Sequence, residues 1–268
     1  MKKFAIWTIA IIITLATALY QRRTGPTYPV EGKAELAGST IRYILDRSHG
    51  GEEDHEVQVK ADNRDVTGSV QYKRYKTDDP WTTLAMLRQE DLLTAKLPHQ
   101  PPAGKLAYKV ILSHEEEQIS LTGERPVIIR FRGDVSPFAL IPHVIIMFLA
   151  MLFSNRAGIE ALRPTANPRK YAIWTLVLLF VGGIILGSIV QKLAFGVFWT
   201  GFPLGYDLTD NKTLIALIGW LVAVIAGRGG KPARWWVLGA AILLLVVYLI
   251  PHSLMGSELD YSQMISSP

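Results

Sequence analysis

Two histidines in repeated tripeptides are the residues whose type and position could do chemistry. Ile-Pro-His occurs at Ile141-Pro142-His143 and again at Ile250-Pro251-His252, in each case at one end of an apolar run. Facing imidazoles could ligate haem, or bind a divalent metal together with a carboxylate or a methionine. A proton or substrate pathway is a second option, because ionisable groups inside a membrane are costly. The simpler interpretation is structural, since a histidine at the interface can turn its polar tip toward water.

A second group of candidate residues lies on the same side of the membrane as the histidines. The loop from Phe198 to Lys212 places aromatic side chains beside two acids and a lysine, and Thr209 or Asp210 could cap the helix that follows. The tail Gly256–Tyr261 follows the last apolar run and should lie beside this loop. The loop and tail would suit a docking surface for a partner or a lid over a site. The residues chosen are Trp199, Phe202, Tyr206, Asp207, Asp210, Lys212, Glu258 and Asp260.

The sequence contains no motif of known catalytic mechanism. His-Glu-x-x-His, Gly-x-Ser-x-Gly and paired intramembrane aspartates are all missing, which disfavours a membrane-embedded hydrolase. The chain has no cysteine, which excludes disulfides, thiolate metal sites and a cysteine nucleophile. No catalytic residue is therefore predicted, and an enzyme is the less favoured class.

Apolar runs in the C-terminal half, residues 135–252, must position these residues. A hydrocarbon core of about 30 Å needs about 20 residues of helix. Tyr171–Val190 meets that length, and Phe138–Phe153 and Trp235–Pro251 do so with flanking residues. Thr213–Gly227 is the weakest candidate, because its length would also suit a buried or re-entrant segment. We expect a bundle of four transmembrane helices.

The N-terminus carries a further apolar run. Residues 1–21 begin Met-Lys-Lys and continue with Phe4–Tyr20, which fits an uncleaved anchor or a secretory signal peptide. The anchor is favoured because the run is long for a signal, and it would bring the bundle to five spans. Residues 22–35, with Gly25, Pro26 and Pro29, are expected to be a linker.

Basic residues predict the orientation. The loops at 155–170 and 227–234 are rich in Lys and Arg, so both should face the cytoplasm. Residues 22–134, the aromatic loop and the tail 253–268 should then be exported. The short Lys-Lys start and the compact cytoplasmic loops favour a bacterial inner membrane, with the exported parts periplasmic or extracellular.

Residues 36–134 show a different periodicity. Short alternating segments separated by turns predict an all-β sandwich of about a hundred residues. The predicted strands are Ser39–Leu45, Glu56–Lys60, Gly68–Tyr75, Thr82–Leu87, Leu92–Leu97, Leu106–Leu112, Gln118–Leu121 and Val127–Phe131.

One stretch of this region resembles a known module. Leu97-Pro98, Pro101-Pro102-Ala103-Gly104 and Leu106–Val110 are similar to the turn that begins the penultimate strand of fibronectin type III and immunoglobulin-like modules. The resemblance implies that Tyr108 is the tyrosine at the corner between sheets and that Trp81 is a core aromatic. It implies a fold and no activity.

Charge and topology together define the functional expectation. The formal net charge of +5 comes from the N-terminus and the cytoplasmic loops, whereas residues 27–134 are slightly acidic, so nucleic acid is not an expected partner. The expected partners are membrane lipid and other proteins of a membrane or envelope complex. The leading hypothesis is an inner-membrane scaffold or accessory subunit that presents its immunoglobulin-like domain to partner proteins. The alternative is a haem- or metal-binding membrane subunit that uses His143 and His252.

Overall fold

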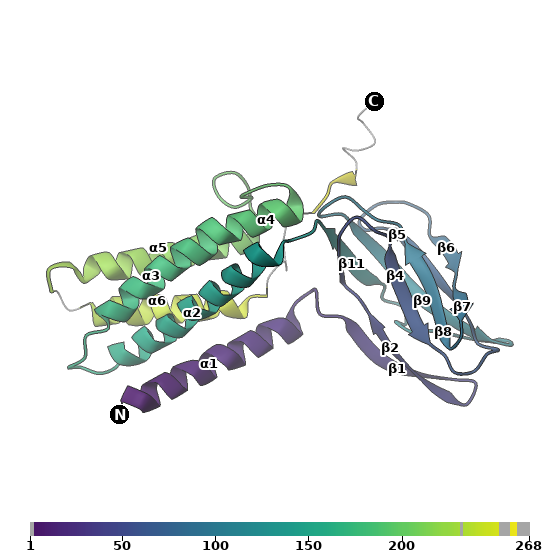
Figure 1. Cartoon of the computed structure of the whole chain (residues 1–268), viewed down its shortest axis with the longest axis horizontal. Helices are drawn as coiled ribbons and strands as arrows, with labels where there is room; N and C mark the ends of the chain where they lie inside the picture. Colours follow the sequence, from purple (N-terminus) through teal and green to yellow (C-terminus); the bar gives the residue numbers. More distant parts are fainter. Residues whose placement is uncertain (1–2, 231–232, 252–257, 262–268) are drawn as a thin grey trace. The chain divides into compact units, whose positions relative to one another are not determined.

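The chain folds into two compact units, a helical unit and a β-rich unit. The computed structural model describes residues 3–230, 233–251 and 258–261. The helical unit comprises Met1–Pro26 and Val135–Ser257, and the β-rich unit comprises Thr27–Asp134 and Glu258–Pro268. Figure 1 shows the helices and strands of the two units. The end of the chain therefore belongs to the β-rich unit, although the last helix belongs to the helical unit.

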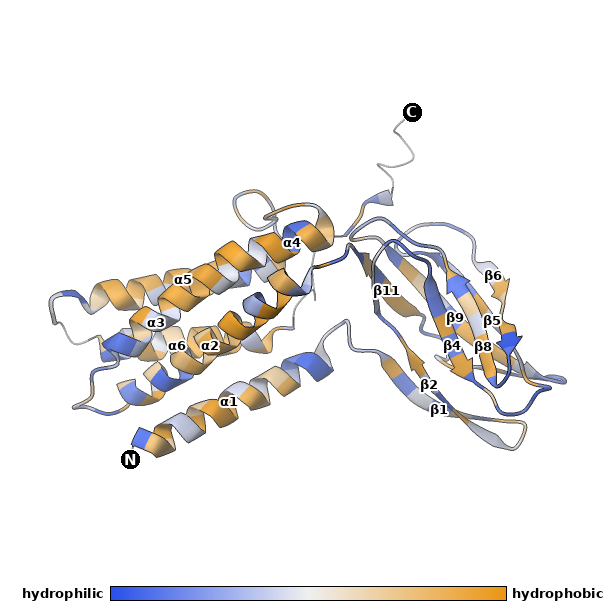
Figure 2. Cartoon of the chain, in the orientation of Figure 1, coloured by the Kyte–Doolittle hydropathy of each residue, from blue (hydrophilic) through white to orange (hydrophobic). Residues whose placement is uncertain are grey.

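Among the described residues of the helical unit, four helices are long and apolar enough to cross a membrane. They are α1 (Lys3–Thr24), α2 (Pro137–Ala161), the continuous helix Arg169–Phe195, and α5 (Leu208–Ala226). The continuous helix is built from α3 (Arg169–Leu179), the π-helical η1 (Phe180–Leu186) and α4 (Gly187–Phe195). The short η2 (Arg228–Gly230) and the apolar α6 (Arg234–Leu249) follow α5. Apolar residues cover most of α2, α3, α5 and α6 in Figure 2.

Of the last two long helices, α5 is the longer, although the sequence predicts it to be the weaker candidate for a span. The run Thr213–Gly227 looked too short to span, but its helix α5 has 19 residues, whereas α6 has 16. The helix α5 begins earlier because Asp207 is its N-cap and accepts hydrogen bonds from the backbone N–H groups of Thr209 and Asp210. The prediction that Thr209 or Asp210 caps this helix is therefore wrong. Both lie inside its first turn.

The loop predicted to begin at Asn155 also begins later, because α2 continues to Ala161. The Arg156 guanidinium lies over the ring of Tyr171, 4.4 Å from its centroid, and 5.4 Å from that of Trp7. Arg156 also pairs with Glu160 one turn later, and its side chain is only 2% exposed. Arg156 and Glu160, which the sequence analysis places in a loop, are thus buried inside the helical unit.

Helix α1 packs against the rest of the helical unit. The rings of Trp7 and Phe153 meet edge to face at 5.7 Å, and Asn155 Nδ2 donates a hydrogen bond to Thr14 Oγ1 at 2.9 Å. Near the other end of α1, Gln21 Nε2 donates to the carbonyl of Tyr248 on α6. These polar and aromatic contacts fix both ends of α1 against its neighbours.

The β-rich unit contains three sheets. In the first, β1 (Val30–Leu36) and β2 (Ser39–Leu45) are antiparallel. The six-stranded sheet follows the order β3 (Ser48–Gly50), β11 (Val127–Arg132), β9 (Lys105–His114), β5 (Thr67–Arg74) and β6 (Thr82–Ala85), and β10 (Glu117–Ser120) also pairs with β9. The third sheet has the order β4 (His55–Lys60), β8 (Leu92–Leu97) and β7 (Leu87–Gln89).

All three sheets contribute to one hydrophobic core. The strand β4 alternates strictly between buried and exposed residues, as expected for a strand with one face on a core. Leu36 of β1, Leu97 of β8 and Phe131 of β11 belong to the same buried cluster. Every predicted strand overlaps an observed one, whereas β1 and β3 were missed because they lie in segments rich in turn-forming residues. The predicted linker 22–35 is therefore partly helix and partly strand.

The structure supports neither role that the resemblance to immunoglobulin-like modules implies. The hydroxyl of a corner tyrosine bonds the backbone only a few residues upstream, whereas that of Tyr108 bonds a carbonyl 62 positions earlier. Tyr108 is fully buried, and its hydroxyl donates a hydrogen bond of 2.8 Å to the carbonyl of Asp46, so it ties β9 to the segment after β2. Burial raises the pKa of Tyr108 well above its ordinary value. Trp81, in contrast, is 40% exposed and lies near the ammonium groups of Lys73 and Lys109. The two lysines lie over its ring at the surface, so Trp81 is not a core aromatic.

Candidate functional site

His143 makes a structural contact inside the helical unit. Its Nδ1 lies 2.9 Å from the carbonyl oxygen of Gly182, in the π-helical segment η1. A π-helical turn displaces backbone carbonyls from their regular α-helical partners, and a nearby ring N–H can satisfy one of them. Glycine at position 182 permits the close approach of α2, because a Cβ there would lie 2.8 Å from Ile146 Cγ2.

The second histidine of the predicted pair, His252, lies outside the described residues. Within residues 3–230, 233–251 and 258–261, no group of three or more His, Asp and Glu side chains is arranged to hold a metal ion. Haem or metal ligation by His143 and His252 therefore stays a prediction.

The acids of the aromatic loop have partners within the helical unit. Asp207 caps α5, and Asp210 Oδ2 accepts hydrogen bonds from the backbone N–H of Thr200 at 2.6 Å and from Gln191 Nε2 at 3.1 Å. Lys212 is 4% exposed and donates to the carbonyl of Ile250 at 2.6 Å. These three charged residues tie the loop to α4, α5 and the end of α6.

Two aromatic residues of the same loop, Phe202 and Tyr206, are exposed and do not pack against the helices. Phe202 is 66% exposed and Tyr206 is 94% exposed, while Trp199 Nε1 donates to the carbonyl of Phe202. Large exposed aromatics beside apolar helices are typical of the membrane interface. The loop therefore separates into a polar framework and an exposed aromatic surface.

The tail segment, residues 258–261, packs on the β-rich unit. The backbone N–H of Leu259 donates to the carbonyl of Ala103 at 3.2 Å. Ala103 has a positive φ of 70°, a conformation that costs a non-glycine residue on the order of 1 kcal/mol. A hydrogen bond from Ala103 N–H to the Phe131 carbonyl holds this turn on β11.

Glu258 is the charged contact of the tail segment. Its two carboxylate oxygens accept hydrogen bonds of 2.6 Å from Lys76 Nζ and Lys105 Nζ. Burial acts to raise the pKa of Glu258, but hydrogen bonds from Lys105 and Lys76 outweigh it, so the pKa lies below its ordinary value. The carboxylate is thus stabilised in its charged form by two lysines from different strands and turns.

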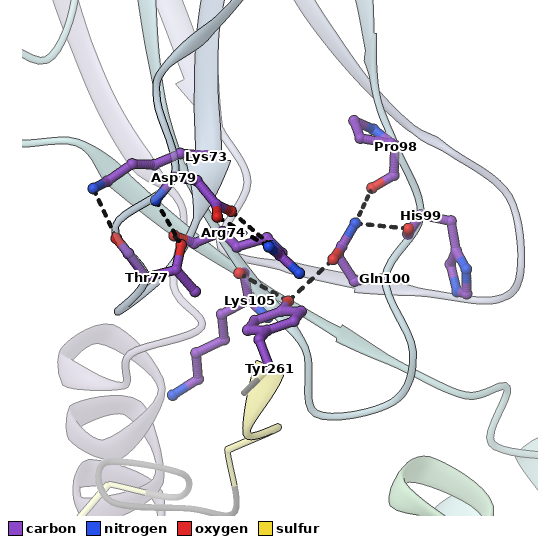
Figure 3. A network of polar contacts seen from close by, with 9 residues as sticks. All are labelled: Lys73, Arg74, Thr77, Asp79, Pro98, His99, Gln100, Lys105 and Tyr261. Carbon is purple, nitrogen blue, oxygen red and sulfur yellow. Dashed lines mark hydrogen bonds and ion pairs between the residues drawn. The ribbon is translucent and has the colours of Figure 1, made fainter. Parts of the chain in front are cut away.

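Tyr261 is the aromatic contact of the tail segment. It is 6% exposed, and its hydroxyl accepts a hydrogen bond of 2.9 Å from the backbone N–H of Lys105. The same oxygen lies 3.1 Å from both Gln100 Oε1 and the Lys105 carbonyl, which share its single proton. Figure 3 shows the ring beside the Arg74 guanidinium, which lies 5.2 Å from its centroid.

Arg74 is held in place by its own partner. Its Nε and Nη2 donate to the two carboxylate oxygens of Asp79 at 2.6 and 2.9 Å, the bidentate geometry that suits a guanidinium. Hydrogen bonding by Arg74 lowers the pKa of Asp79 to about 2. The turn between β5 and β6 is closed further by Lys73 and Thr77, as the dashed contacts in Figure 3 indicate.

An open groove of about 700 Å³ lies between this turn and the tail segment. It is called here the tail groove. Its walls are residues 74–80, Ala103 and Lys105 on one side and the tail segment on the other. Cationic, anionic and aromatic side chains all line it.

Sequence reasoning found only part of this site. Glu258 and Asp260 were chosen as candidates, but they were expected beside the aromatic loop. The residues that receive the tail segment, Arg74, Lys76 and Lys105, were not singled out, because a lysine or arginine at a strand end or turn is ordinary. Only their position in the folded β-rich unit indicates that they bind the tail segment.

Comparison with known proteins adds no family assignment. A scan of protein-family models, a search of curated proteins and a search of solved structures each find no match for this chain.

Proposed function

We propose that the chain is an integral membrane scaffold or accessory subunit that binds partner proteins through its β-rich unit. The observation that carries this proposal is the tail groove, because it already holds a polypeptide segment by a backbone hydrogen bond, an ion pair and an aromatic anchor. Aromatic and arginine side chains of this kind dominate the energetics of protein interfaces.

The β-rich unit is proposed to be an immunoglobulin-like sandwich. Three sheets around one core support that fold. We propose that the sandwich lies on the exported side of a bacterial inner membrane, in the periplasm. A cytoplasmic position for two connections is supported by the basic residues in or beside them. These are Arg163, Arg169 and Lys170 at the connection between α2 and α3, and Arg228 and Arg234 at the connection between α5 and α6.

The contact between the tail segment and the β-rich unit supports a fifth span. Four helices are long enough to cross, but α6 would extend only about 24 Å at 1.5 Å per residue. Between Asp134 and Glu258 the chain must cross an even number of times for the tail segment to reach the β-rich unit. If α2, α3 to α4 and α5 each cross, then α6 crosses too, with Trp235 and Trp236 near one interface.

The first helix is proposed to be a retained anchor. A cleaved signal peptide would take with it the contacts of Trp7, Thr14 and Gln21 with the other helices. In particular, the buried Arg156 would lose one of its two aromatic neighbours. The intact mass of the purified protein distinguishes the two cases, because cleavage removes the residues that contain Trp7.

Site-specific photo-cross-linking in native membranes tests the binding function. A photoreactive amino acid at Thr77, on the turn that lines the tail groove, is expected to cross-link to another protein. The matched control is Glu116, an exposed residue at the turn between β9 and β10. Cross-links at position 77 and not at 116 would support the proposal. A chain that forms no cross-links from any exposed face of its β-rich unit, and that is extracted alone in mild detergent, would contradict it.

A further inference from the structure

Building on the proposed function, we infer that the tail groove receives a short segment of a partner protein that carries an acidic residue three positions before a tyrosine. The chain's own Glu258 and Tyr261 have that spacing and already bind Lys105 of the β-rich unit, as a built-in competitor. The partner's segment would displace the tail segment and bind the same residues of the β-rich unit.

The groove offers three separate recognition elements. Lys76 and Lys105 bind the carboxylate, the Ala103 carbonyl binds a backbone N–H, and Gln100 with the Lys105 backbone binds the phenol oxygen. Lys105 takes part in two of these elements, through its ammonium group and through its backbone. A segment with only the acid or only the tyrosine would lose one of these elements.

The charge of the groove favours an acidic segment. The side chain of Lys105 is only 16% exposed, and among the residues that the structure describes Glu258 is the acid that forms an ion pair with it. Arg74 is already neutralised by Asp79 and presents its planar face to the tyrosine ring. Removal of Glu258 would leave Lys105 half-desolvated without a carboxylate, which costs free energy until another acid arrives.

The chain's own tail segment is held weakly enough for a partner's segment to replace it. Lys76 is 62% exposed and Glu258 is 35% exposed, so their ion pair at the rim contributes little. The less exposed contacts are the pair of Glu258 with Lys105 and the buried ring of Tyr261, the single aromatic anchor. A short segment with one anchor gains occupancy mainly from its covalent connection, which raises its local concentration.

The groove also has room for more than the tail segment. About 700 Å³ stays open beside it, lined by the turn after β5. Protein interiors leave few voids larger than a water molecule, and pockets for ligands occupy about 300 to 1,000 Å³. A longer partner segment could fill this space through residues that flank its acid and tyrosine.

Peptide binding to the full chain in detergent tests the inference. The probe is a fluorescent, end-capped peptide with the sequence of residues 256–263, Gly-Ser-Glu-Leu-Asp-Tyr-Ser-Gln. It is titrated into the intact chain and into a chain ended after Ser257. We expect saturable binding to the shortened chain and at least about tenfold weaker binding to the intact chain, because the own tail competes. Control peptides replace the glutamate by glutamine or the tyrosine by alanine, and each should bind at least about tenfold more weakly.

Receptor variants localise the binding. Lys105→Gln should weaken it about tenfold, whereas Lys109→Gln, on the same strand β9 but beside Trp81, should leave it unchanged. Equal binding to the intact and shortened chains, or no binding to the shortened chain, would overturn the inference. So would a homodimer cross-linked from tail to groove, because the occupant would then be a second copy. A partner that cross-links at position 77 regardless of added peptide would overturn it too, while leaving the proposed function intact.

Discussion

The phenol oxygen of Tyr261 lies 2.9 Å from the backbone nitrogen of Lys105, 156 positions earlier in the chain. The side-chain ammonium of the same lysine lies 2.6 Å from a carboxylate oxygen of Glu258. One residue of β9 therefore holds the tail segment at both ends, through its backbone and through its side chain. Removal of the lysine side chain alone separates these contributions.

Docking of the tail segment should depend on pH through Glu258. Its pKa in the folded chain lies below the ordinary value of 4.5, since the hydrogen bonds from Lys105 and Lys76 outweigh burial. The resulting stabilisation is complete above pH 4.5 and is lost as the pH falls through the lowered pKa. Hydrogen exchange at Leu259 and Lys105, corrected for intrinsic rates, should rise in that window. Glu258→Gln should dock more weakly at neutral pH and show no such change.

His55 should destabilise the β-rich unit in mild acid. It is 6% exposed on β4, its Nδ1 lies 3.3 Å from Nδ1 of His49, and burial lowers its pKa below 6.5. As the pH falls below 6.5, the unfolded chain takes up a proton that the folded chain does not, so stability decreases until the pH passes the lowered pKa. Urea titration followed by the β-sheet signal in circular dichroism at pH 7.5 and 5.5 measures this effect. A pH dependence that is the same in His55→Gln would assign it to another group.

The absence of cysteine makes the proposed orientation directly testable. Single cysteines at Thr83 of β6 and Leu204 of the aromatic loop should react with a membrane-impermeant maleimide in spheroplasts. A cysteine at Arg228, in the connection between α5 and α6, should react only after the membrane is opened. Labelling of Arg228→Cys in closed spheroplasts would reverse or disprove the topology.

The buried pair of Arg156 and Glu160 should be sensitive to loss of one partner. Glu160→Ala leaves the Arg156 guanidinium, whose side chain is 2% exposed, without its carboxylate, and should destabilise the helical unit by about 3 kcal/mol. Arg163→Gln is the matched control, because Arg163 also contacts Glu160 but is 37% exposed, so its loss should cost no more than about 1 kcal/mol. Unfolding of the detergent-solubilised protein measures both changes. Equal effects would show that burial of Arg156 does not decide the outcome.

His143 should act as a hydrogen-bond partner of the π-helical segment. His143→Ala leaves the Gly182 carbonyl without its ring N–H and should destabilise the helical unit by about 1 to 2 kcal/mol. The alternative metal or haem site predicts about one metal per chain, lost in the same variant. Elemental analysis and an absorption spectrum of protein purified without chelators separate these outcomes. Stoichiometric metal that depends on His143 would replace the structural role by a ligand role.

Local sequence patterns determined the types of the elements and most of their positions. Long apolar runs are sufficient to indicate helices that can span a membrane, because backbone groups in lipid must be satisfied within the helix. Alternating segments indicate strands, because successive side chains point to opposite faces. The strands β2 and β8 accordingly coincide with their predicted ranges.

Contacts between distant residues were decided only by the tertiary structure. The sequence predicts Arg156 in a loop, whereas in the structure it lies between Trp7 and Tyr171. The resemblance implies that Trp81 is a core residue, whereas in the structure it lies at the surface beside Lys109. The tail segment could be recognised as acidic and aromatic, but its binding site is formed by residues from a turn and two strand ends that no local pattern connects. The sequence by itself therefore determined most of the elements, although not strands β1 and β3, whereas folding decided which ionisable residues meet. The physical reason is that periodicity is a property of neighbouring residues, while a binding site depends on tertiary contacts.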